Sequence, residues 1–230
     1  MTLVNGARHW TASEGTGPPV VLLHGGPGVC DYLAPVVPML SDRWTVRRYE
    51  QRGCGRSEAV GPYAMATLAA DLDALVDAWG HERVALVGHS FGAALALYYA
   101  IQRPERVLRL VLWCGMGIAF GWEAEHRANV EARLGAEELR RFDALRAALR
   151  AGAADAAAHE EWGRLLALAD LADRRNAHLI PDPVFAYPTN FEANRELNAD
   201  WKRVVGEERL AERARRLAVP TRVWNAAGDP

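Results

Sequence analysis

The sequence predicts an α/β protein with a doubly wound, mostly parallel sheet and an inserted all-helical segment. Strand-like and helix-like segments alternate over residues 1–115, which indicates parallel strands with helices on both faces. Residues 116–217 are dominated by amphipathic helical patterns, and a strand-like segment returns in residues 218–230. A structureless loop as long as the middle segment would be improbable in a compact domain, so we interpret it as a helical insertion between two parts of one core.

Composition excludes several classes of protein. The 230 residues are 50% hydrophobic and 24% charged with a formal net charge of -2, so the chain lacks the basic field that nucleic-acid binding requires. No run approaches the ~20 apolar residues of a membrane span, and the N-terminus lacks a signal core, so we expect a cytoplasmic protein with no membrane partner. Three cysteines without a C-x-x-C pair, and histidines without metal-ligand spacing, predict free thiols, no metal and no cofactor.

The elements of the first part follow from turn signals and hydrophobic periodicity. Asn5-Gly6 suits a tight hairpin turn. The apolar run VVLL at residues 20–23 is typical of a central parallel strand, and residues 44–49 form a more alternating strand. Apolar residues at helical spacing predict a helix over 68–79, which Gly80 ends.

The alternation continues to the end of the first part and then stops. We predict a strand at 83–87, a helix at 91–102 and a strand at 107–113. The insertion contains amphipathic helical stretches at residues 135–150, 153–175 and 190–205.

The sharpest functional signal is Gly88-His89-Ser90-Phe91-Gly92, which lies between a predicted strand and a predicted helix. A serine at the apex of such a turn is forced into a strained conformation, and side chains two positions before and after it would collide, hence the two glycines. The motif therefore predicts Ser90 as a nucleophile.

The second signal is His24-Gly25-Gly26-Pro27-Gly28, directly after the buried strand. Acyl transfer needs two backbone N–H groups aimed at the developing oxyanion, and we assign them to Gly26 and Phe91. A phosphate-binding loop is the rival interpretation, but no phosphate-loop pattern is present and Pro27 removes an N–H.

With these motifs, the chain resembles the α/β-hydrolase superfamily and, within it, the proline iminopeptidase-like branch. The matching segments are HGGPG at 24–28, EQRGCGRS at 50–57, GHSFG at 88–92 and NAAGDP at 225–230. Two departures are Glu50, where the family usually has Asp, and Ala93, where a further Gly is common. The resemblance implies a helical cap over the active site and a Ser, Asp, His triad in that chain order.

Carried over residue by residue, the triad consists of Ser90 as nucleophile and Asp229 as the acid that orients a histidine. In the family that histidine lies a few tens of residues beyond the acid, outside these 230 residues. We therefore expect a C-terminally truncated chain, without the last strand and helix of the fold, that turns over slowly or not at all. An internal histidine is the less favoured alternative, because His24 is expected to brace the oxyanion loop and His89 to point away from its neighbour.

The expected truncation also leaves the strand at 221–226 as an unprotected sheet edge. We expect the chain to associate with itself through that edge.

Further predictions concern Arg52 and two of the cysteines. Arg52, in the turn at 51–57, is expected to bridge neighbouring loops rather than to act in catalysis. Cys30 and Cys54 follow adjacent strands, so they predict either thiol-reagent sensitivity near the pocket mouth or buried, inert thiols.

In the insertion, Glu192 and Glu196 share one helix face beside Trp201. If this face is a binding site, its carboxylates bind a substrate's α-ammonium group, as the resemblance to an iminopeptidase requires. The alternative is a solvated helix face.

The leading hypothesis is a serine hydrolase that releases an N-terminal residue from a peptide or amide. A carboxylic ester or lactone hydrolase is the runner-up, and a catalytically inactive hydrolase-fold binding protein is the alternative from another class. The expected partner is a small-molecule or short-peptide substrate. Serine rather than aspartate at position 90 argues against epoxide hydrolysis, which uses a carboxylate nucleophile.

Overall fold

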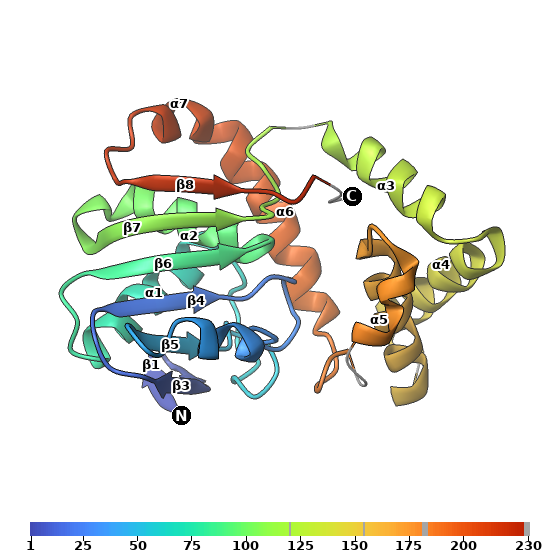
Figure 1. Ribbon diagram of the computed structural model, residues 1–230, viewed down its shortest axis with the longest axis horizontal. Helices are drawn as coiled ribbons and strands as arrows, with labels where there is room; N and C mark the ends of the chain where they lie inside the picture. The colour runs from blue at the N-terminus through green and yellow to red at the C-terminus, as the bar shows by residue number, and fades with distance from the viewer. Residues whose placement is uncertain (120, 154, 181–183, 228–230) are drawn as a thin grey trace.

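A computed structural model describes residues 1–119, 121–153, 155–180 and 184–227. Within this part of the chain, a six-stranded sheet has the order β3-β5-β4-β6-β7-β8, in which only the β3–β5 pair is antiparallel (Figure 1). The strands are β3 (Thr11–Glu14), β4 (Pro19–Leu23), β5 (Thr45–Tyr49), β6 (Val84–His89), β7 (Val107–Trp113) and β8 (Thr221–Trp224). The predicted α/β class and mostly parallel sheet are confirmed.

The N-terminal hairpin is confirmed where the sequence predicts it. Strands β1 (Thr2–Val4) and β2 (Ala7–His9) pair antiparallel. The two residues between them, Asn5 and Gly6, have φ values of 47° and 73°, the left-handed conformation that this turn requires.

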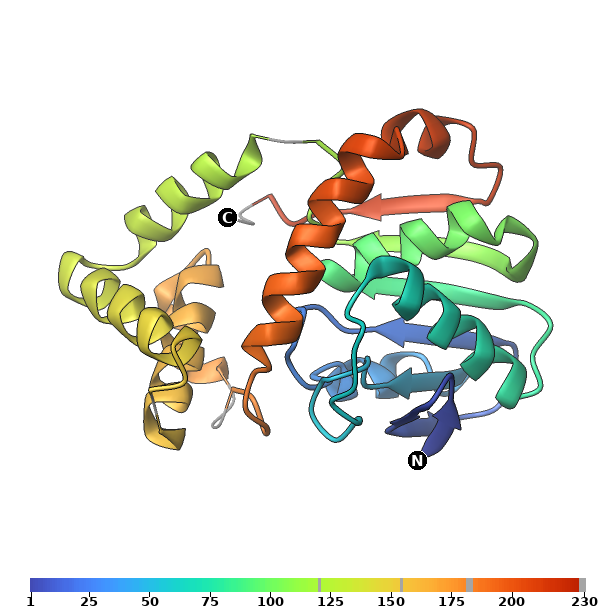
Figure 2. The same cartoon turned by 180° about the vertical axis from the view of Figure 1, so that it is seen from behind.

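The two faces of the sheet are covered unequally, as the opposite views in Figures 1 and 2 show. Helices α1 (Met65–Ala78), α2 (Phe91–Gln102), α6 (Phe191–Glu207) and α7 (Leu210–Arg215) share the main hydrophobic core with one face. On the other face the 3-10 helix η1 (Ala34–Met39) covers a smaller cluster over β4 and β5. A second 3-10 helix, η2 (Pro104–Arg106), leads directly into β7.

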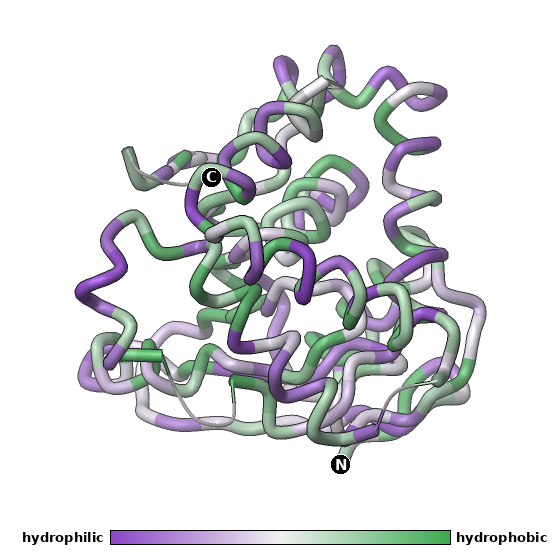
Figure 3. The backbone as a smooth tube through the Cα atoms, turned by 90° about the vertical axis from the view of Figure 1, so that its right-hand side faces the viewer, coloured by the Kyte–Doolittle hydropathy of each residue, from purple (hydrophilic) through white to green (hydrophobic). Residues whose placement is uncertain are grey.

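The remaining helices form a group of their own beside the carboxyl ends of the strands (Figure 1). These are α3 (Trp122–Arg133), α4 (Ala136–Arg150), α5 (Ala156–Asp170) and the 3-10 helix η3 (Arg174–Leu179). We call α3, α4 and α5 the cap cluster, because their buried side chains, among them Phe142 and Trp162, form a hydrophobic cluster separate from the main core. Along the chain, hydrophilic and hydrophobic residues alternate repeatedly, as amphipathic helices require (Figure 3).

Packing divides the predicted insertion at 116–217 into two parts. Helix α6 buries Ala193, Leu197, Trp201 and Val204 in the main core beside the sheet, whereas α3, α4 and α5 do not share that core. The boundaries of the insertion stay a prediction. Amphipathic spacing shows that a helix has an apolar stripe, but it does not show which layer the stripe packs against.

Candidate active site

Ser90 occupies a sharp turn between β6 and α2. Its φ of 55° and ψ of -120° lie in a region that non-glycine residues rarely adopt. The turn is held by its own backbone, because the Ser90 N–H donates to the Trp113 carbonyl at 3.0 Å and the Ser90 carbonyl accepts from the Ala93 N–H at 3.0 Å.

The two glycines of the motif are required by backbone contacts. A Cβ on Gly88 would lie 2.2 Å from the carbonyl oxygen of Gly92. A Cβ on Gly92 would lie 2.1 Å from the carbonyl oxygen of Leu23, at the end of β4. Both neighbours are backbone atoms that cannot rotate away, so any side chain at either position would collide, as the motif predicts.

The glycine-rich loop after β4 comes directly against Ser90. A Cβ on Gly25 would lie 2.8 Å from the Ser90 Cβ. The next residue, Gly26, is exposed and has a φ of +129° that favours glycine. Phe91 is the first residue of α2 and directly follows Ser90, and Gly26 directly follows Gly25, so the two predicted oxyanion donors lie in segments that meet at Ser90. Their assignment as an oxyanion hole stays a prediction.

His24 links the glycine-rich loop to the end of β5. Its Nδ1 lies 2.9 Å from the Gly25 carbonyl, and its Nε2 lies 3.1 Å from the N–H of Gln51. The Gln51 amide returns a bond of 2.7 Å to the His24 carbonyl. Because a backbone N–H can only donate, Nε2 accepts and Nδ1 carries the proton. Burial lowers the pKa of His24, which is consistent with a neutral ring.

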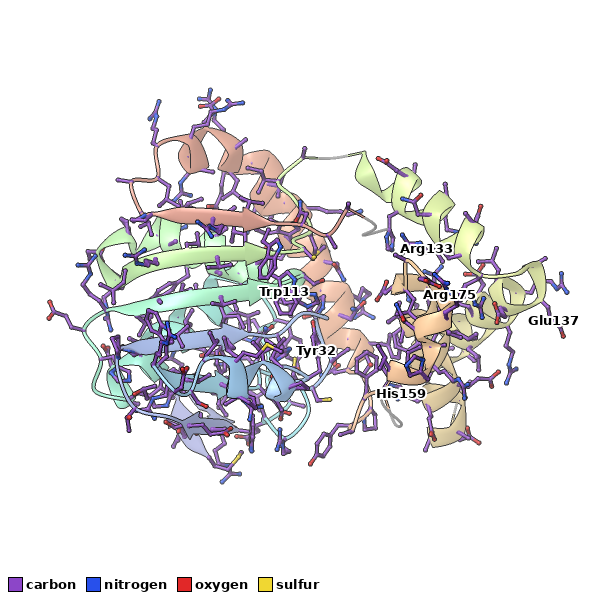
Figure 4. The ribbon with its side chains drawn as sticks, in the orientation of Figure 1. Tyr32, Trp113, Arg133, Glu137, His159 and Arg175 are labelled. Atoms are coloured by element: carbon purple, nitrogen blue, oxygen red, sulfur yellow. The ribbon has the colours of Figure 1, made fainter. Side chains whose placement is uncertain are left out.

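Tyr32 is a site residue that the sequence analysis did not identify. Its hydroxyl lies 2.9 Å from the Gly25 nitrogen and 2.6 Å from His89 Nδ1. Figure 4 shows Tyr32 and Trp113 on the side of the sheet that faces the cap cluster. The position of Tyr32 follows no local pattern, which is why sequence reasoning missed it.

Arg52 is buried and makes a bidentate ion pair with Asp71, with both distances 2.8 Å. It also donates to the carbonyls of Asn5 and Val60, so it ties the N-terminal hairpin to α1 and the loop before it. These contacts are the bridging that the sequence analysis expected.

Glu50, the departure from the family pattern, is fully buried and accepts from the Arg56 guanidinium at 2.8 Å. A Cβ on Gly55 would lie 2.5 Å from the Glu50 carboxylate, so the glycine leaves room for the larger acid.

The start of α6 is attached to the glycine-rich loop. The Asn190 N–H donates to the Gly28 carbonyl at 2.8 Å, and the Asn194 amide donates to the Pro27 carbonyl at 2.8 Å. Asn190 also caps α6, with its Oδ1 accepting from the first-turn amides of residues 192 and 193, while its Nδ2 donates to the Gly53 carbonyl. Asparagine is a common N-cap residue, but no local pattern indicates that this helix start contacts the glycine-rich loop.

Cys30 and Cys54 are both buried. Burial raises the pKa of both thiols, and that of Cys54 reaches about 12. The structure therefore favours buried, inert thiols over the alternative of reactive thiols at a pocket mouth.

The predicted substrate-binding residues of α6 are not gathered around Ser90 by any contact found among the described residues. Glu192 is exposed, and Glu196 is half-buried with its carboxylate 3.6 Å from the Arg195 guanidinium. Trp201 packs in the main core with 4% of its surface exposed, so its indole presents little surface to a ligand. Asp200, on the same helix, accepts from the Met65 N–H at 2.7 Å and thereby caps α1.

The predicted acid and the predicted base of the triad are not seen beside Ser90 in the described part of the chain. Asp229 lies outside the described residues. Among the residues that the structure describes, no histidine hydrogen-bonds to the Ser90 hydroxyl; His159, for example, lies on α5 and bonds to Thr189 (Figure 4).

The described residues show neither a metal-ion site nor a membrane-spanning helix. No group of three or more His, Cys, Asp or Glu residues is placed to hold a metal ion there. No helix in the described ranges is long and apolar enough to cross a membrane.

Comparison with known proteins assigns the family. The model of the alpha/beta hydrolase fold family matches residues 18–204, which is most of the sequence. The chain therefore belongs to the alpha/beta hydrolase fold family.

The curated relatives have diverse activities. The chain is 34% identical over 111 residues to a soluble epoxide hydrolase of Corynebacterium sp. and 39% identical over 125 residues to a 2-hydroxy-6-oxo-2,4-heptadienoate hydrolase of Pseudomonas putida. It is 33% identical over 108 residues to a proline iminopeptidase of Saccharolobus solfataricus. These matches cover 48%, 52% and 45% of this chain, but only 39%, 45% and 35% of the relatives, so the matched segments span less than half of their length.

Solved structures agree on the fold. An alpha/beta fold family hydrolase from Bacillus anthracis aligns with a TM-score of 0.67 at 17% identity, over 94% of this chain and 76% of that chain. A meta-cleavage product hydrolase aligns with a TM-score of 0.65 at 23% identity, over 97% and 78%. At these identities the likeness concerns the fold alone.

Proposed function

We propose that this α/β-hydrolase is a serine hydrolase that transfers an acyl group to Ser90. The observation that carries the proposal is the contact of the glycine-rich loop with the strained turn, where Gly25 leaves no room for a Cβ beside Ser90. Gly26 follows Gly25 in this loop and Phe91 follows Ser90, so the contact supports a pair of donors beside one nucleophile. Such preorganised N–H groups stabilise charge that develops in the transition state.

The reaction follows from these roles. Ser90 Oγ forms a bond to the acyl carbon while a general base takes the hydroxyl proton, and the carbonyl oxygen becomes an oxyanion facing Gly26 and Phe91. Collapse expels the leaving group, which takes up the proton. Water then attacks the acyl-enzyme, releases the acid and restores Ser90. In this scheme the base is a histidine that Asp229 orients.

The first experiment asks whether Ser90 is activated. The 230-residue protein is treated with a fluorophosphonate, with and without added imidazole, and Ser90→Ala is the control. Since no described histidine contacts the Ser90 hydroxyl, we expect slow labelling that imidazole accelerates and that Ser90→Ala abolishes. Labelling that persists in Ser90→Ala, or none in the presence of imidazole, would support the alternative of an inactive binding protein.

The substrate class has two candidates. Proline iminopeptidases among the relatives support release of an N-terminal residue from a peptide or amide, as the sequence analysis proposed. The exposure of Glu192 and the burial of Trp201 favour a carboxylic ester or lactone instead, because the ammonium-binding carboxylates are not assembled beside Ser90. Serine at position 90 separates both candidates from the carboxylate chemistry expected of an epoxide hydrolase.

A paired assay distinguishes the candidates. A proline p-nitroanilide with a free N-terminus, which releases p-nitroaniline, and a short acyl p-nitrophenyl ester, which releases p-nitrophenol, are compared under the imidazole conditions. A preference for the amide that falls in Glu192→Gln or Glu196→Gln supports the iminopeptidase. Hydrolysis of the ester alone, unchanged in both variants, supports the ester hydrolase.

Self-association through β8 remains a proposal. In the described sheet β8 is the outermost strand next to β7, and Val223 and Trp224 are 65% and 63% exposed. Exposed edges of this kind pair with other strands. Sedimentation over a hundredfold dilution should show a dimer that dissociates, and Val223→Lys should give a monomer at every concentration. A monomer in the wild type throughout would exclude the proposal.

A further inference from the structure

Tyr32 connects the two loops that meet at Ser90. Its hydroxyl is within hydrogen-bond distance of Gly25, in the glycine-rich loop, and of His89, the residue before Ser90. The bond to Gly25 has a defined direction, because a backbone N–H can only donate, so the Tyr32 oxygen accepts it.

The second bond uses the hydroxyl proton. Tyr32 Oη lies 2.6 Å from His89 Nδ1, and burial raises the pKa of Tyr32, so the phenol keeps its proton. Because the Tyr32 oxygen already accepts from the Gly25 N–H, we assign the phenol proton to the bond with Nδ1, which places the His89 proton on Nε2. The chain of bonds runs from the Gly25 N–H to the Tyr32 oxygen and from the Tyr32 proton to His89.

The rings hold this arrangement from both sides. His89 packs edge-on against Trp113 with ring centroids 4.7 Å apart, and Tyr32 packs edge-on against His89 at 5.6 Å. Such contacts restrict the orientation of the imidazole. Its Nδ1 therefore remains directed to the Tyr32 hydroxyl.

Gly25 lies between the Tyr32 hydroxyl and Ser90, so the hydrogen bond to Tyr32 fixes the loop beside the serine. A Cβ on Gly25 would lie 2.4 Å from Tyr32 Oη and 2.8 Å from Ser90 Cβ, so its α-carbon is wedged between the hydroxyl and the serine. The Gly25 N–H is occupied by Tyr32, which leaves the following N–H, that of Gly26, for an oxyanion. Fixing Gly25 fixes the peptide plane that carries this donor.

We propose that Tyr32 is a positioning residue, which sets the distance between the Gly26 and Phe91 oxyanion donors by hydrogen-bonding both loops that carry them. This inference rests on the proposed function of Ser90 and goes beyond it, since it assigns a role to a residue outside both motifs. Tyr32 touches neither the substrate nor the reacting atoms, and acts through Gly25 and His89.

The test uses Tyr32→Phe, which removes the two hydrogen bonds and keeps the ring. The matched control is Tyr49→Phe, because the Tyr49 hydroxyl is buried and has no hydrogen-bond partner among the described residues. Ester hydrolysis and fluorophosphonate labelling are measured with imidazole present, together with thermal unfolding.

Loss of one oxyanion donor lowers kcat by roughly 10²- to 10³-fold, so its displacement by Tyr32→Phe should lower kcat and the labelling rate by roughly 10- to 100-fold. KM should stay within about twofold of the wild type, because the donors act in the transition state. Tyr49→Phe should keep the wild-type kcat. Equal kcat values in the two variants, or a raised KM with unchanged kcat, would overturn the proposal.

Nuclear magnetic resonance gives a readout that needs no turnover. In the wild type the His89 ring should carry its proton on Nε2, and Tyr32→Phe, but not Tyr49→Phe, should shift the amide signals of Gly26 and Phe91. A His89 protonated on Nδ1, or unmoved amide signals, would overturn the positioning role. A wild type that shows these signals but no Ser90 labelling would uphold the link between the loops and reject the proposed function alone.

Discussion

The sheet region around Ser90 and the cap cluster are held together by different physical means. At the site, backbone atoms approach so closely that Gly88 and Gly92 admit no Cβ, and the Arg52–Asp71 pair is 3% and 1% exposed. In the cap cluster the helices pack through a smaller apolar cluster and are joined by half-exposed ion pairs such as Arg127–Asp143. We infer that the backbone around Ser90 is more tightly constrained than the backbone of the cap cluster, so substitutions should cost more around Ser90.

The largest expected effect is the loss of a buried charge partner. Arg52→Ala removes the guanidinium from the buried Asp71 carboxylate, which keeps only neutral or weakly placed neighbours, the Asn5 amide at 3.1 Å and His9 Nε2 at 3.5 Å, so the free energy of unfolding should fall by about 3–5 kcal/mol. The counterpart is Arg174→Ala, because Arg174 pairs with Glu138 near the cap cluster at half-exposed positions and should cost at most about 1 kcal/mol. Urea unfolding of both variants checks this. Equal losses would remove the distinction between the two regions.

Replacing a glycine by alanine in each region tests how tightly the backbone is packed there. Gly92→Ala places a Cβ against the Leu23 carbonyl, so we expect a loss of about 1–3 kcal/mol and slower labelling of Ser90. Gly152, after α4, has a φ of +67° and no atom within 4 Å of an added Cβ. Gly152→Ala should therefore cost only the backbone conformation, about 1 kcal/mol, and leave labelling unchanged. Unimpaired labelling in Gly92→Ala would contradict the tight packing at the turn.

A third comparison concerns helix caps. Asn190→Ala removes the cap of α6 and the bond to the Gly53 carbonyl, so it should cost about 1–2 kcal/mol and also slow Ser90 labelling. Asp155→Ala removes the cap of α5, which accepts from the Ala158 N–H, and should cost about 1 kcal/mol with no effect on labelling. If both variants slowed labelling equally, the connection between α6 and the glycine-rich loop would not be specific.

The smallest expected effect is in the pH dependence of unfolding. Burial lowers the pKa of His24 below 6.5, so its contribution to stability is complete above pH 6.5 and decreases as the pH falls below that value. Hydrogen bonds from Arg174 lower the pKa of Glu138 from 4.5 to about 2, so its contribution is complete above pH 4.5 and is lost as the pH falls towards 2. The sheet region should therefore weaken at a higher pH than the Arg174–Glu138 contact.

Urea unfolding at pH 7.5, 5.5 and 3.5 measures this order. His24→Asn should reduce the decrease between pH 7.5 and 5.5, to which His9, His81 and His159 also contribute because burial lowers their pKa values. Glu138→Gln should reduce the decrease only between pH 5.5 and 3.5. A wild type whose free energy of unfolding is constant down to pH 5 would show that protonation of His24 does not destabilise the sheet region.

Features that a few neighbouring residues impose could be predicted from the sequence. The Asn5-Gly6 turn, the strained Ser90 and the glycines on either side of it follow from local backbone sterics, which do not depend on the rest of the chain. The parallel sheet followed from the alternation of strand and helix patterns.

Contacts between segments that are distant in the sequence could not be predicted and are seen only in the folded chain. Met65 and Asp200 are 135 positions apart, and Gly53 and Asn190 are 137 apart, yet each pair is joined by a hydrogen bond. The packing of α6 on the main core and the hydrogen bond between Tyr32 and His89 also join segments that are far apart in the sequence. An apolar stripe or a hydroxyl has many compatible partners, and the packing of the whole chain selects one of them.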